Sequence, residues 1–419
     1  MMKMMKKLCC LLTAGLMLLA ASGCGSAFEA EYEYEEAVTG SFGTLSGDAT
    51  EIRNYSMLKT ALTDMISRHE EQGEFRLSNY NGNPSEDLAA ACYEIKSQNP
   101  LGSYAVESLS YDTSYVVSYY MANIFVSYQH TAEEIGNVIY AVTQNEFDGL
   151  VRNAADNFQT DAVIRIYSSG VDENHIYNLI RQHYYDDPVS MAAEPAIRVE
   201  SYPNEGANRI YSIHFDYAAS ESQMGRMSRE LAAALDAAVT ELPEEEPPKL
   251  ALAAAQWLSG LAADYGETVY GDTAYGAVVE HSANSKGVAL AFRALCQRLQ
   301  IPCEVVEGSV GAMGAEPHFW NIIELGGEHY HVDVSAFADA PGTSFLLSDD
   351  ALWGTYIWET AAYPECSGSL SYADVAELPE QAIPAEEATP GEETPPEDIP
   401  TAEPEEELEN SEEKTENTP

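Results

Sequence analysis

Apolar and polar residues follow one recurring order between residues 52 and 217. Apolar positions at helical spacing are interleaved with short alternating segments, which predicts a helix, a strand, a second helix and two strands. This order occurs twice, so we expect two small α+β units in tandem. In the first unit the predicted helix, strand and second helix lie at residues 57–66, 75–77 and 87–96, and the second of the two strands that follow lies at residues 115–128. In the second unit the five elements lie at residues 146–157, 162–167, 173–185, 197–202 and 209–217.

The rest of the chain opens with an amphipathic pattern that predicts a linking helix over residues 222–242. Three prolines around three glutamates follow at residues 243–248 and indicate a domain boundary. Beyond them the pattern predicts a helix, a second helix that begins at Asn284-Ser285, a strand, a strand headed by His318 and a strand that ends at Asp333. The predicted bounds of the two helices and the first strand are 250–265, 285–299 and 303–307.

Three residues in this part of the chain suggest a catalytic arrangement. Ser285 is placed at a helix N-terminus, and His318 and Asp333 are placed on neighbouring strands. A nucleophile, a base and a group that orients the base are often assembled from such elements. The free N–H groups and the dipole of a helix N-terminus also favour negative charge on a nucleophile.

Six short motifs follow one another in this part of the chain: Ala274-Tyr275-Gly276, Gly287-x-Ala289-x-Ala291-Phe292, Gln300-Ile301-Pro302-Cys303-x-Val305-Val306-x-Gly308, His318-Phe319-Trp320-Asn321, Tyr330-x-Val332-Asp333 and Phe345-Leu346-Leu347-Ser348-Asp349-Asp350. With these motifs, residues 249–372 resemble the transglutaminase-like superfamily, whose fold is papain-like. The resemblance implies a Cys-His-Asp triad, with His318 at the histidine position and Asp333 at the aspartate position.

The chain departs from this family at the nucleophile, because Ser285 occupies the position of the catalytic cysteine. A thiol with a pKa of about 8.5 ionises readily beside a helix N-terminus and a protonated histidine, whereas a serine hydroxyl needs a base during attack. Cys296 and Cys303 lie in apolar runs and are expected to pack in the core. We therefore expect a pseudoenzyme, with an active Ser285-His318-Asp333 triad as the alternative.

The first residues have the form of a bacterial export signal. Lysines precede an apolar segment that is too short to span a membrane, and Ala21-Ser22-Gly23-Cys24 resembles a lipobox. We expect Cys24 to be lipidated, which would anchor the protein outside the bacterial cytoplasmic membrane; an ordinary cleaved secretory signal is the alternative. No later run is long and apolar enough to span a bilayer, so the expected anchor is the lipid alone.

Charge and cysteine content exclude further classes of function and site. A formal net charge of −49 argues against nucleic acid and against attraction to an anionic membrane. Four cysteines remain after Cys24, too few for a disulfide scaffold, although one bridge between Cys303 and Cys366 is open. His329 and His331 alternate on a strand, but the sequence shows no Cys or carboxylate cluster to complete a zinc site, so no metal or cofactor is expected.

The expected fold class is α+β, with a transglutaminase-like domain after the tandem units. The expected ligand is a peptide, a cell-wall component or a surface protein; an active cell-surface peptidase, amidase or acyltransferase is the alternative. A third hypothesis places binding in the tandem units, whose strands are rich in tyrosine. The expected organisation is a lipoprotein signal (1–23), a flexible acidic linker (24–51), the two units (52–140 and 141–220), a linking helix (221–246), the transglutaminase-like domain (247–375) and a disordered acidic tail (376–419).

Overall fold

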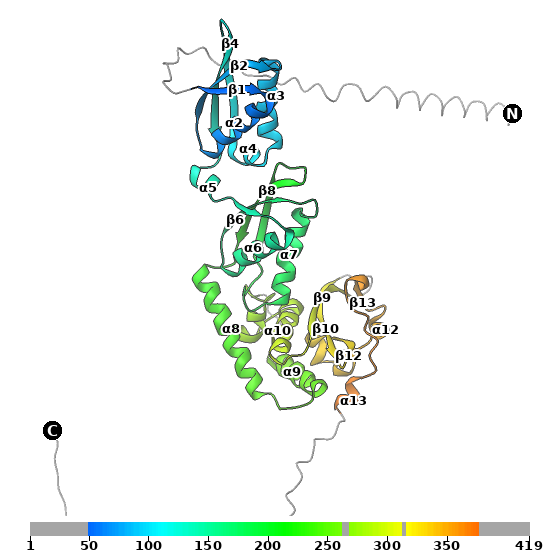
Figure 1. Ribbon diagram of the computed structural model, residues 1–419. Coiled ribbons are helices and arrows are strands. Elements are labelled where there is room, and N and C mark those ends of the chain that lie inside the picture. The colour runs from blue at the N-terminus through cyan, green and yellow to red at the C-terminus, as the bar shows by residue number, and fades with distance from the viewer. Residues whose placement is uncertain (1–48, 262–267, 312–315, 377–419) are drawn as a thin grey trace, which may run out of the picture. The chain divides into compact units, whose positions relative to one another are not determined.

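The computed structural model describes residues 49–261, 268–311 and 316–376. Helices and strands are mixed along the chain, in agreement with the α+β class expected from the sequence (Figure 1). The strands are β1 Thr50–Asn54, β2 Gln72–Asn81, β3 Val106–Val116, β4 Tyr119–Tyr128, β5 Ile139–Ala141, β6 Asp161–Tyr167, β7 Ala196–Tyr202, β8 Asn208–Asp216, β9 Cys303–Val310, β10 Glu316–Leu325, β11 Glu328–Val332, β12 Phe345–Leu347 and β13 Tyr356–Trp358. The α-helices are α2 Tyr55–Ser67, α3 Pro84–Gln98, α4 Pro100–Ala105, α5 Ala132–Gly136, α6 Gln144–Asp156, α7 Glu173–Asp186, α8 Glu221–Glu241, α9 Pro247–Leu261, α10 Ser285–Arg298, α11 Val334–Phe337, α12 Asp349–Leu352 and α13 Tyr372–Ala376.

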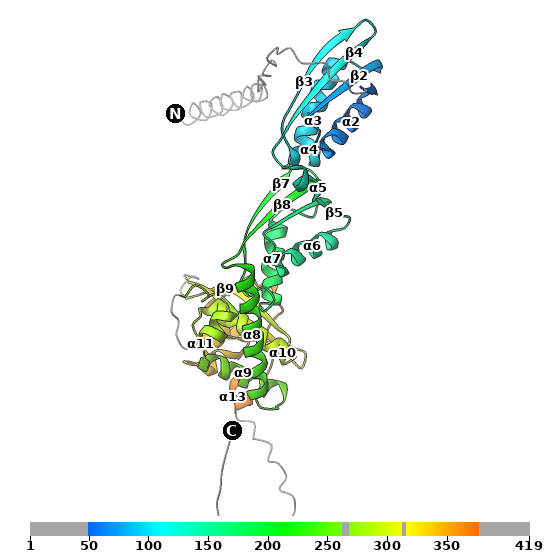
Figure 2. The ribbon, with the colours of Figure 1, turned by 90° about the vertical axis from the view of Figure 1, so that its left-hand side faces the viewer.

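The first sheet has the strand order β1-β2-β4-β3, and α2 and α3 cover one of its faces (Figure 2). Local chemistry fixes the starts of both helices. The side chain of Asn54 accepts a hydrogen bond from the N–H of Met57, and Asn83 caps α3 directly before Pro84. We call β1 to α5 the first sheet unit.

The second sheet has the order β5-β6-β8-β7, which repeats the topology of the first. In both sheets the first two strands are parallel and the others are antiparallel. Thr143 and Asp172 cap the helices α6 and α7, which lie together on one face of this sheet (Figure 2). We call β5 to β8 the second sheet unit. Apolar residues of its inner face form one continuous core with the C-terminal part of the chain.

The structure corrects three details of the expected tandem units. Residues 115–128, expected to form one strand, contain the end of β3, a turn and all of β4, and Val117 in the turn has a positive φ of 45°. The short parallel strands β1 and β5 were not expected, because neither is long enough to show alternation. β1 begins inside the expected linker, and β5 crosses the expected boundary between residues 140 and 141.

The third sheet has the order β12-β11-β10-β9-β13, and α10 packs against β9 and β10. One face of α10 is wholly buried, including Phe292 and Leu295. The sequence Gln300-Ile301-Pro302, in which Gln300 has a positive φ of 58°, ends the helix and turns the chain into β9. This arrangement places the first residue of α10 beside β10, the strand that carries His318.

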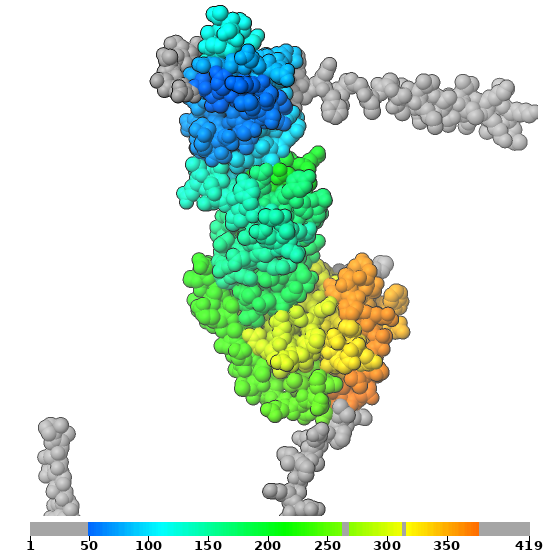
Figure 3. Space-filling view, viewed as in Figure 1, coloured from blue at the N-terminus to red at the C-terminus, as the bar shows by residue number. Residues whose placement is uncertain are grey.

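The second sheet unit packs directly against the C-terminal sheet and α10 (Figure 3). Tyr185, near the end of α7, meets the ring of Phe319 edge-on, with centroids 6.4 Å apart. Arg181 of the same helix pairs with Glu307 of β9 at 3.5 Å. Within the described residues, no helix combines the length and the apolarity needed to cross a membrane.

Candidate functional site

The N-terminus of α10 is fixed by a cap and by close backbone packing. The side chain of Asn284 accepts hydrogen bonds from the N–H groups of Lys286 and Gly287 at 2.9 and 3.2 Å. A Cβ at Gly287 would lie 2.6 Å from the carbonyl oxygen of Gly271, so only glycine permits this approach. Ser285 is the first residue of the helix, and its own N–H has no hydrogen-bond partner among the described residues.

His318 and Asp333 meet beside this helix end. β10 and β11 are antiparallel, with Asn321 opposite Val332, so His318 near the start of β10 lies close to the residue that follows β11. The Nε2 atom of His318 is 2.7 Å from an Oδ2 oxygen of Asp333. The histidine side chain is 16% exposed and the aspartate side chain 3%, so the pair is almost closed to solvent on the aspartate side.

Asp333 accepts hydrogen bonds from other groups besides His318. Tyr356 of β13 donates its hydroxyl proton to Oδ2 at 2.7 Å, and Ser335 and the N–H of Ala336 donate to Oδ1. Burial by itself raises the pKa of this carboxyl, but the hydrogen bond and charge of His318, with Ser335 and Tyr356, bring it below its usual value. Asp333 therefore stays ionised and fixes the orientation of the imidazole.

Ser285 is next to the pair but is not hydrogen-bonded to it. Its Oγ atom accepts a hydrogen bond from the backbone N–H of Phe319 at 3.3 Å. Among the described residues, no hydrogen bond joins the hydroxyl to His318, and the Nδ1 atom of that ring has no partner. The structure thus brings the three predicted residues into one place, while the contact that makes a serine nucleophilic is missing from it.

Lys286, the neighbour of Ser285, connects the site to the second sheet unit. Its Nζ atom is 2.6 Å from Glu194, in the segment between α7 and β7. The same ammonium group lies over the rings of Tyr185 and Phe319, at 5.5 and 5.8 Å from their centroids. No local pattern predicts this contact, because Glu194 and Lys286 are far apart along the chain.

A second buried histidine lies in the same sheet. The Nδ1 atom of His331 accepts a hydrogen bond from the indole N–H of Trp320 at 3.0 Å, and its Nε2 atom is 2.8 Å from Asp349. The side chain of His331 is 1% exposed and therefore closed to solvent. Burial lowers the pKa of His331 more than Asp349 raises it, so the ring is neutral.

The surroundings of His331 also correct the expectation that no cysteine or carboxylate joins it. Its ring nitrogen, an Asp349 oxygen and the Cys366 sulfur all lie within 4.8 Å of one another. The donation from Trp320 leaves Nδ1 unprotonated, so in the neutral ring Nε2 carries the proton and faces Asp349. A metal ligand needs a bare nitrogen, and burial raises the pKa of the Cys366 thiol to about 12. This arrangement reads as a hydrogen-bonded core group.

The remaining cysteines are buried thiols. All four are free: Cys92, Cys296, Cys303 and Cys366. The disulfide between Cys303 and Cys366, which the sequence left open, is therefore not formed. Cys296 is fully buried, and burial raises its pKa well above the usual value, which suits a packing residue. Cys24, the expected lipidation site, lies outside the described residues.

Comparison with known proteins gives little further information. No protein family matches the chain, and no curated protein matches it. Among solved structures, one titled "Crystal structure of a TGase" is similar to it, with 12% sequence identity over 69% of this chain and 82% of that chain. The TM-score is 0.24, so the chain has at most a distant transglutaminase-like neighbour, and the likeness carries no argument about the site.

Proposed function

We propose that the protein is a lipid-anchored, extracytoplasmic peptide-binding protein whose C-terminal domain is a catalytically silent relative of the transglutaminase-like enzymes. The proposal combines the sequence resemblance with the geometry around Ser285. The domain retains the histidine–aspartate pair but carries a hydroxyl at the position of the thiol. Its role is to hold a peptide at the former active site.

One observation carries this proposal. The Ser285 hydroxyl oxygen accepts the N–H of Phe319, and no hydrogen bond joins it to His318. A serine hydroxyl becomes a useful nucleophile only when a base removes its proton during attack. The helix dipole, which suffices to help ionise a thiol, does not replace that base for an alcohol. The missing contact between Ser285 and His318 supports a site that does not start acyl transfer.

The same site retains groups that suit a peptide carbonyl. The N–H of Ser285 has no partner among the described residues, and His318 has a free Nδ1 atom and a partly exposed ring. The first N–H groups of a helix have no partner within the helix, so the Ser285 N–H is available to a carbonyl oxygen that binds there.

A peptide array tests binding and turnover together. The soluble ectodomain is incubated with an array of acetylated synthetic peptides, and retention and cleavage are scored for wild type, Ser285→Ala and His318→Ala. We expect retention by wild type and by Ser285→Ala, loss of retention in His318→Ala, and no cleavage by any variant. Cleavage or transamidation that disappears in Ser285→Ala would refute the proposal.

The alternative function is an active peptidase, amidase or acyltransferase that uses Ser285, His318 and Asp333. The 2.7 Å contact between His318 and Asp333 favours it, because that pair orients an imidazole in working triads. A serine-reactive fluorophosphonate probe separates the two proposals. Labelling of wild type that is lost in Ser285→Ala supports the enzyme, whereas absence of labelling supports the binding protein.

The proposed location is tested by the Cys24→Ala variant. If Cys24 carries the lipid, the wild-type protein partitions with the membrane and the variant is released or retains its uncleaved signal. A wild-type protein that is soluble after export would instead indicate ordinary signal cleavage.

A further inference from the structure

The hairpin formed by β3 and β4 ends in an exposed apolar turn. We call residues 115–120, with the sequence Tyr-Val-Val-Ser-Tyr-Tyr, the β3–β4 tip. Val117 is 92% exposed and Tyr115 is 65% exposed, and Val116 and Tyr120 are exposed as well. The rings of Tyr115 and Tyr120 lie side by side, with centroids 5.0 Å apart. Figure 2 shows the hairpin extending past the other elements of the first sheet unit.

The equivalent hairpin of the second sheet unit has a different turn. β7 and β8 occupy the places in their sheet that β3 and β4 occupy in the first. Their turn contains Asn204, Glu205 and Gly206, and Gly206 has a positive φ of 102°. Polar residues and glycine are favoured in such turns, whereas a β-branched residue such as Val117 adopts its positive φ of 45° only at a cost in free energy. An exposed apolar turn that is also strained indicates a role beyond joining two strands.

The tip lies in an uncharged stretch of a strongly acidic chain. Residues 113–129 contain no Asp, Glu, Lys or Arg, although the formal net charge of the chain is −49. At the base of the tip, the Arg76 guanidinium lies 4.9 Å from the ring centroid of Tyr119 and 3.4 Å from the Glu51 carboxylate. These two opposite charges offset each other. The tip can therefore approach lipid headgroups without the repulsion that acidic surfaces meet from phosphate groups.

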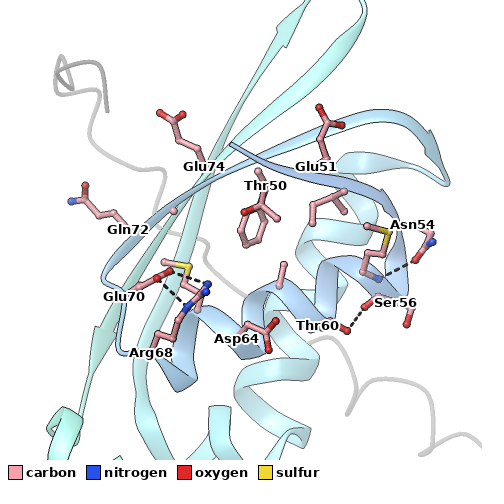
Figure 4. A pocket seen from close by; sticks show the side chains of 16 residues that line it. Thr50, Glu51, Asn54, Ser56, Thr60, Asp64, Arg68, Glu70, Gln72 and Glu74 are labelled. Atoms are coloured by element: carbon pink, nitrogen blue, oxygen red, sulfur yellow. Dashed lines mark hydrogen bonds and ion pairs between the residues drawn. The ribbon is translucent and has the colours of Figure 1, made fainter. Parts of the chain in front are cut away.

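Other acidic side chains of the first sheet unit lie back from the tip. Figure 4 shows Asp64 and Glu74 at a groove of about 950 Å³ between α2 and β2. Glu74 is opposite Asn123, four residues along β4 from Tyr119. β1 runs parallel to β2 toward the tip, so its first residue, Thr50, is farther from the tip than its last. The unit thus has an uncharged apolar end and an acidic groove behind it.

We propose that the β3–β4 tip contacts the lipid bilayer, with its valines among the outer acyl chains and its tyrosines at the level of the headgroups. This inference rests on the proposed lipid anchor at Cys24. A tyrosine has an apolar ring and a polar hydroxyl, which favours it at the interface between membrane and water. The 25 residues from 25 to 49 span at most about 90 Å, so the anchor keeps the tip near the bilayer. Because the tip is tethered in this way, a weak contact is enough.

The size of the tip favours a bilayer over a protein partner. A standard protein interface buries about 800 Å² and about 20–30 residues on each side. The tip has six residues on a narrow hairpin, which are too few for a stable dimer of two copies. Contact with a bilayer needs no second shaped surface, because its strength follows the apolar area that enters the lipid.

Fluorescence quenching by lipid tests the contact. The full lipidated chain is placed on phosphatidylcholine vesicles that contain 5-doxyl-phosphatidylcholine as the quencher. Bimane is attached to the thiol of Ser118→Cys in the tip, or of Glu205→Cys in the equivalent turn, and wild type gives the background from its buried thiols. We expect the tip label to be quenched at least about twofold more than the turn label. Equal quenching of the two labels would overturn the inference.

Flotation of the vesicles separates this inference from the anchor on which it rests. Wild-type protein that does not float with the vesicles has no lipid anchor, which overturns both. Protein that floats but shows equal quenching of the two labels overturns the tip contact alone. Emission of the tip label that changes with the density of protein on the vesicle, without quenching by lipid, would assign the tip to a second copy and overturn the contact with lipid.

Paired substitutions show whether the apolar side chains carry the contact. Tyr115→Ser/Val117→Ser is made in the chain with the tip label, and Ile139→Ser/Val142→Ser is the matched variant, since Ile139 and Val142 are 47% and 83% exposed in the second sheet unit. We expect the tip variant to lower quenching to the level of the turn label and the matched variant to leave it unchanged. Equal effects of the two variants would overturn the inference. The comparison of the two labels does not depend on either variant.

Discussion

Ser285 and Phe319 are joined by a hydrogen bond of 3.3 Å, in which the backbone N–H of Phe319 donates to the serine oxygen. Phe319 directly follows His318, so the serine is held by the backbone next to the base and not by the base. The Nε2 atom of the imidazole is bound to Asp333 instead. A base and its orienting carboxylate are assembled here beside a hydroxyl that is hydrogen-bonded to neither of them among the described residues.

The Ser285→Cys variant tests whether His318 and the N-terminus of α10 can stabilise a thiolate at this position. A thiolate at this position would be stabilised by the helix N-terminus and by protonated His318, so its pKa should fall below about 8.5. We expect iodoacetamide to alkylate the variant at about pH 6 to 7 at least about tenfold faster than Ser285→Cys/His318→Ala. Wild type gives the background from its buried thiols. Equal rates for the single and double variants would show that His318 has no influence on this position.

Asp333→Asn tests how much the buried carboxylate contributes to the stability of the fold. The substitution removes a charge that receives hydrogen bonds from His318, Tyr356, Ser335 and the N–H of Ala336, and leaves an amide group facing donors. We expect a loss of about 2–3 kcal/mol in the free energy of unfolding at neutral pH, measured by urea denaturation. Asp339→Asn, at an exposed position, is the control and should change it by less than about 0.5 kcal/mol.

The stability difference between wild type and Asp333→Asn should depend on pH. The folded-state pKa of Asp333 is lowered, so its contribution is fully present above the unfolded value of about 3.9 and is lost as the pH falls through the folded value. Plotted against pH, the free energies of unfolding of wild type and Asp333→Asn should therefore differ by a constant amount above about pH 5 and approach each other below about pH 4. A difference that stays constant down to about pH 2 would contradict the assignment of the lowered pKa to this residue.

His331 should make the folded protein sensitive to mild acid. Its folded-state pKa is lowered by burial, so the unfolded chain takes up the proton first as the pH falls below about 6.5. Protonation of Nδ1 would also break the hydrogen bond from Trp320. We expect wild type to lose stability between about pH 7 and 5 relative to His331→Asn, with Trp fluorescence as the measurement. His329→Asn, on the same strand but more exposed, should follow wild type.

Some of this architecture could be predicted from the sequence because it depends on local patterns. Asn284 caps α10 and Pro302 follows its end, so the bounds expected for that helix, 285–299, differ from the observed ones by a single residue. The placement of His318 and Asp333 on adjacent strands followed from the order of short apolar runs. Local patterns also predicted α6 and α7 closely, since each begins at a residue that favours capping.

The features that could not be predicted from the sequence depend on contacts between residues that are distant along the chain. Tyr356 reaches Asp333 from β13, a strand of three residues that has no visible alternation. Asp349 and Cys366 approach His331 only because the sheet brings their loops together. The tip between β3 and β4 was missed for another reason. Its residues are apolar and β-branched, so the turn at Val117 has the composition of a strand.

The ion pair between Lys286 and Glu194 should contribute more to stability than the exposed ion pairs of the chain. Its side chains are 16% and 26% exposed, and the ammonium group also packs over aromatic rings. A double-mutant cycle with Lys286→Met and Glu194→Gln should give a coupling energy of about 1–2 kcal/mol. The Arg226–Glu230 pair on α8, with side chains 59% and 44% exposed, is the control and should give less than about 0.5 kcal/mol. Equal couplings would mean that the contact beside Ser285 does not hold the second sheet unit in place, and that this unit is fixed by the apolar packing of Tyr185 on Phe319 instead.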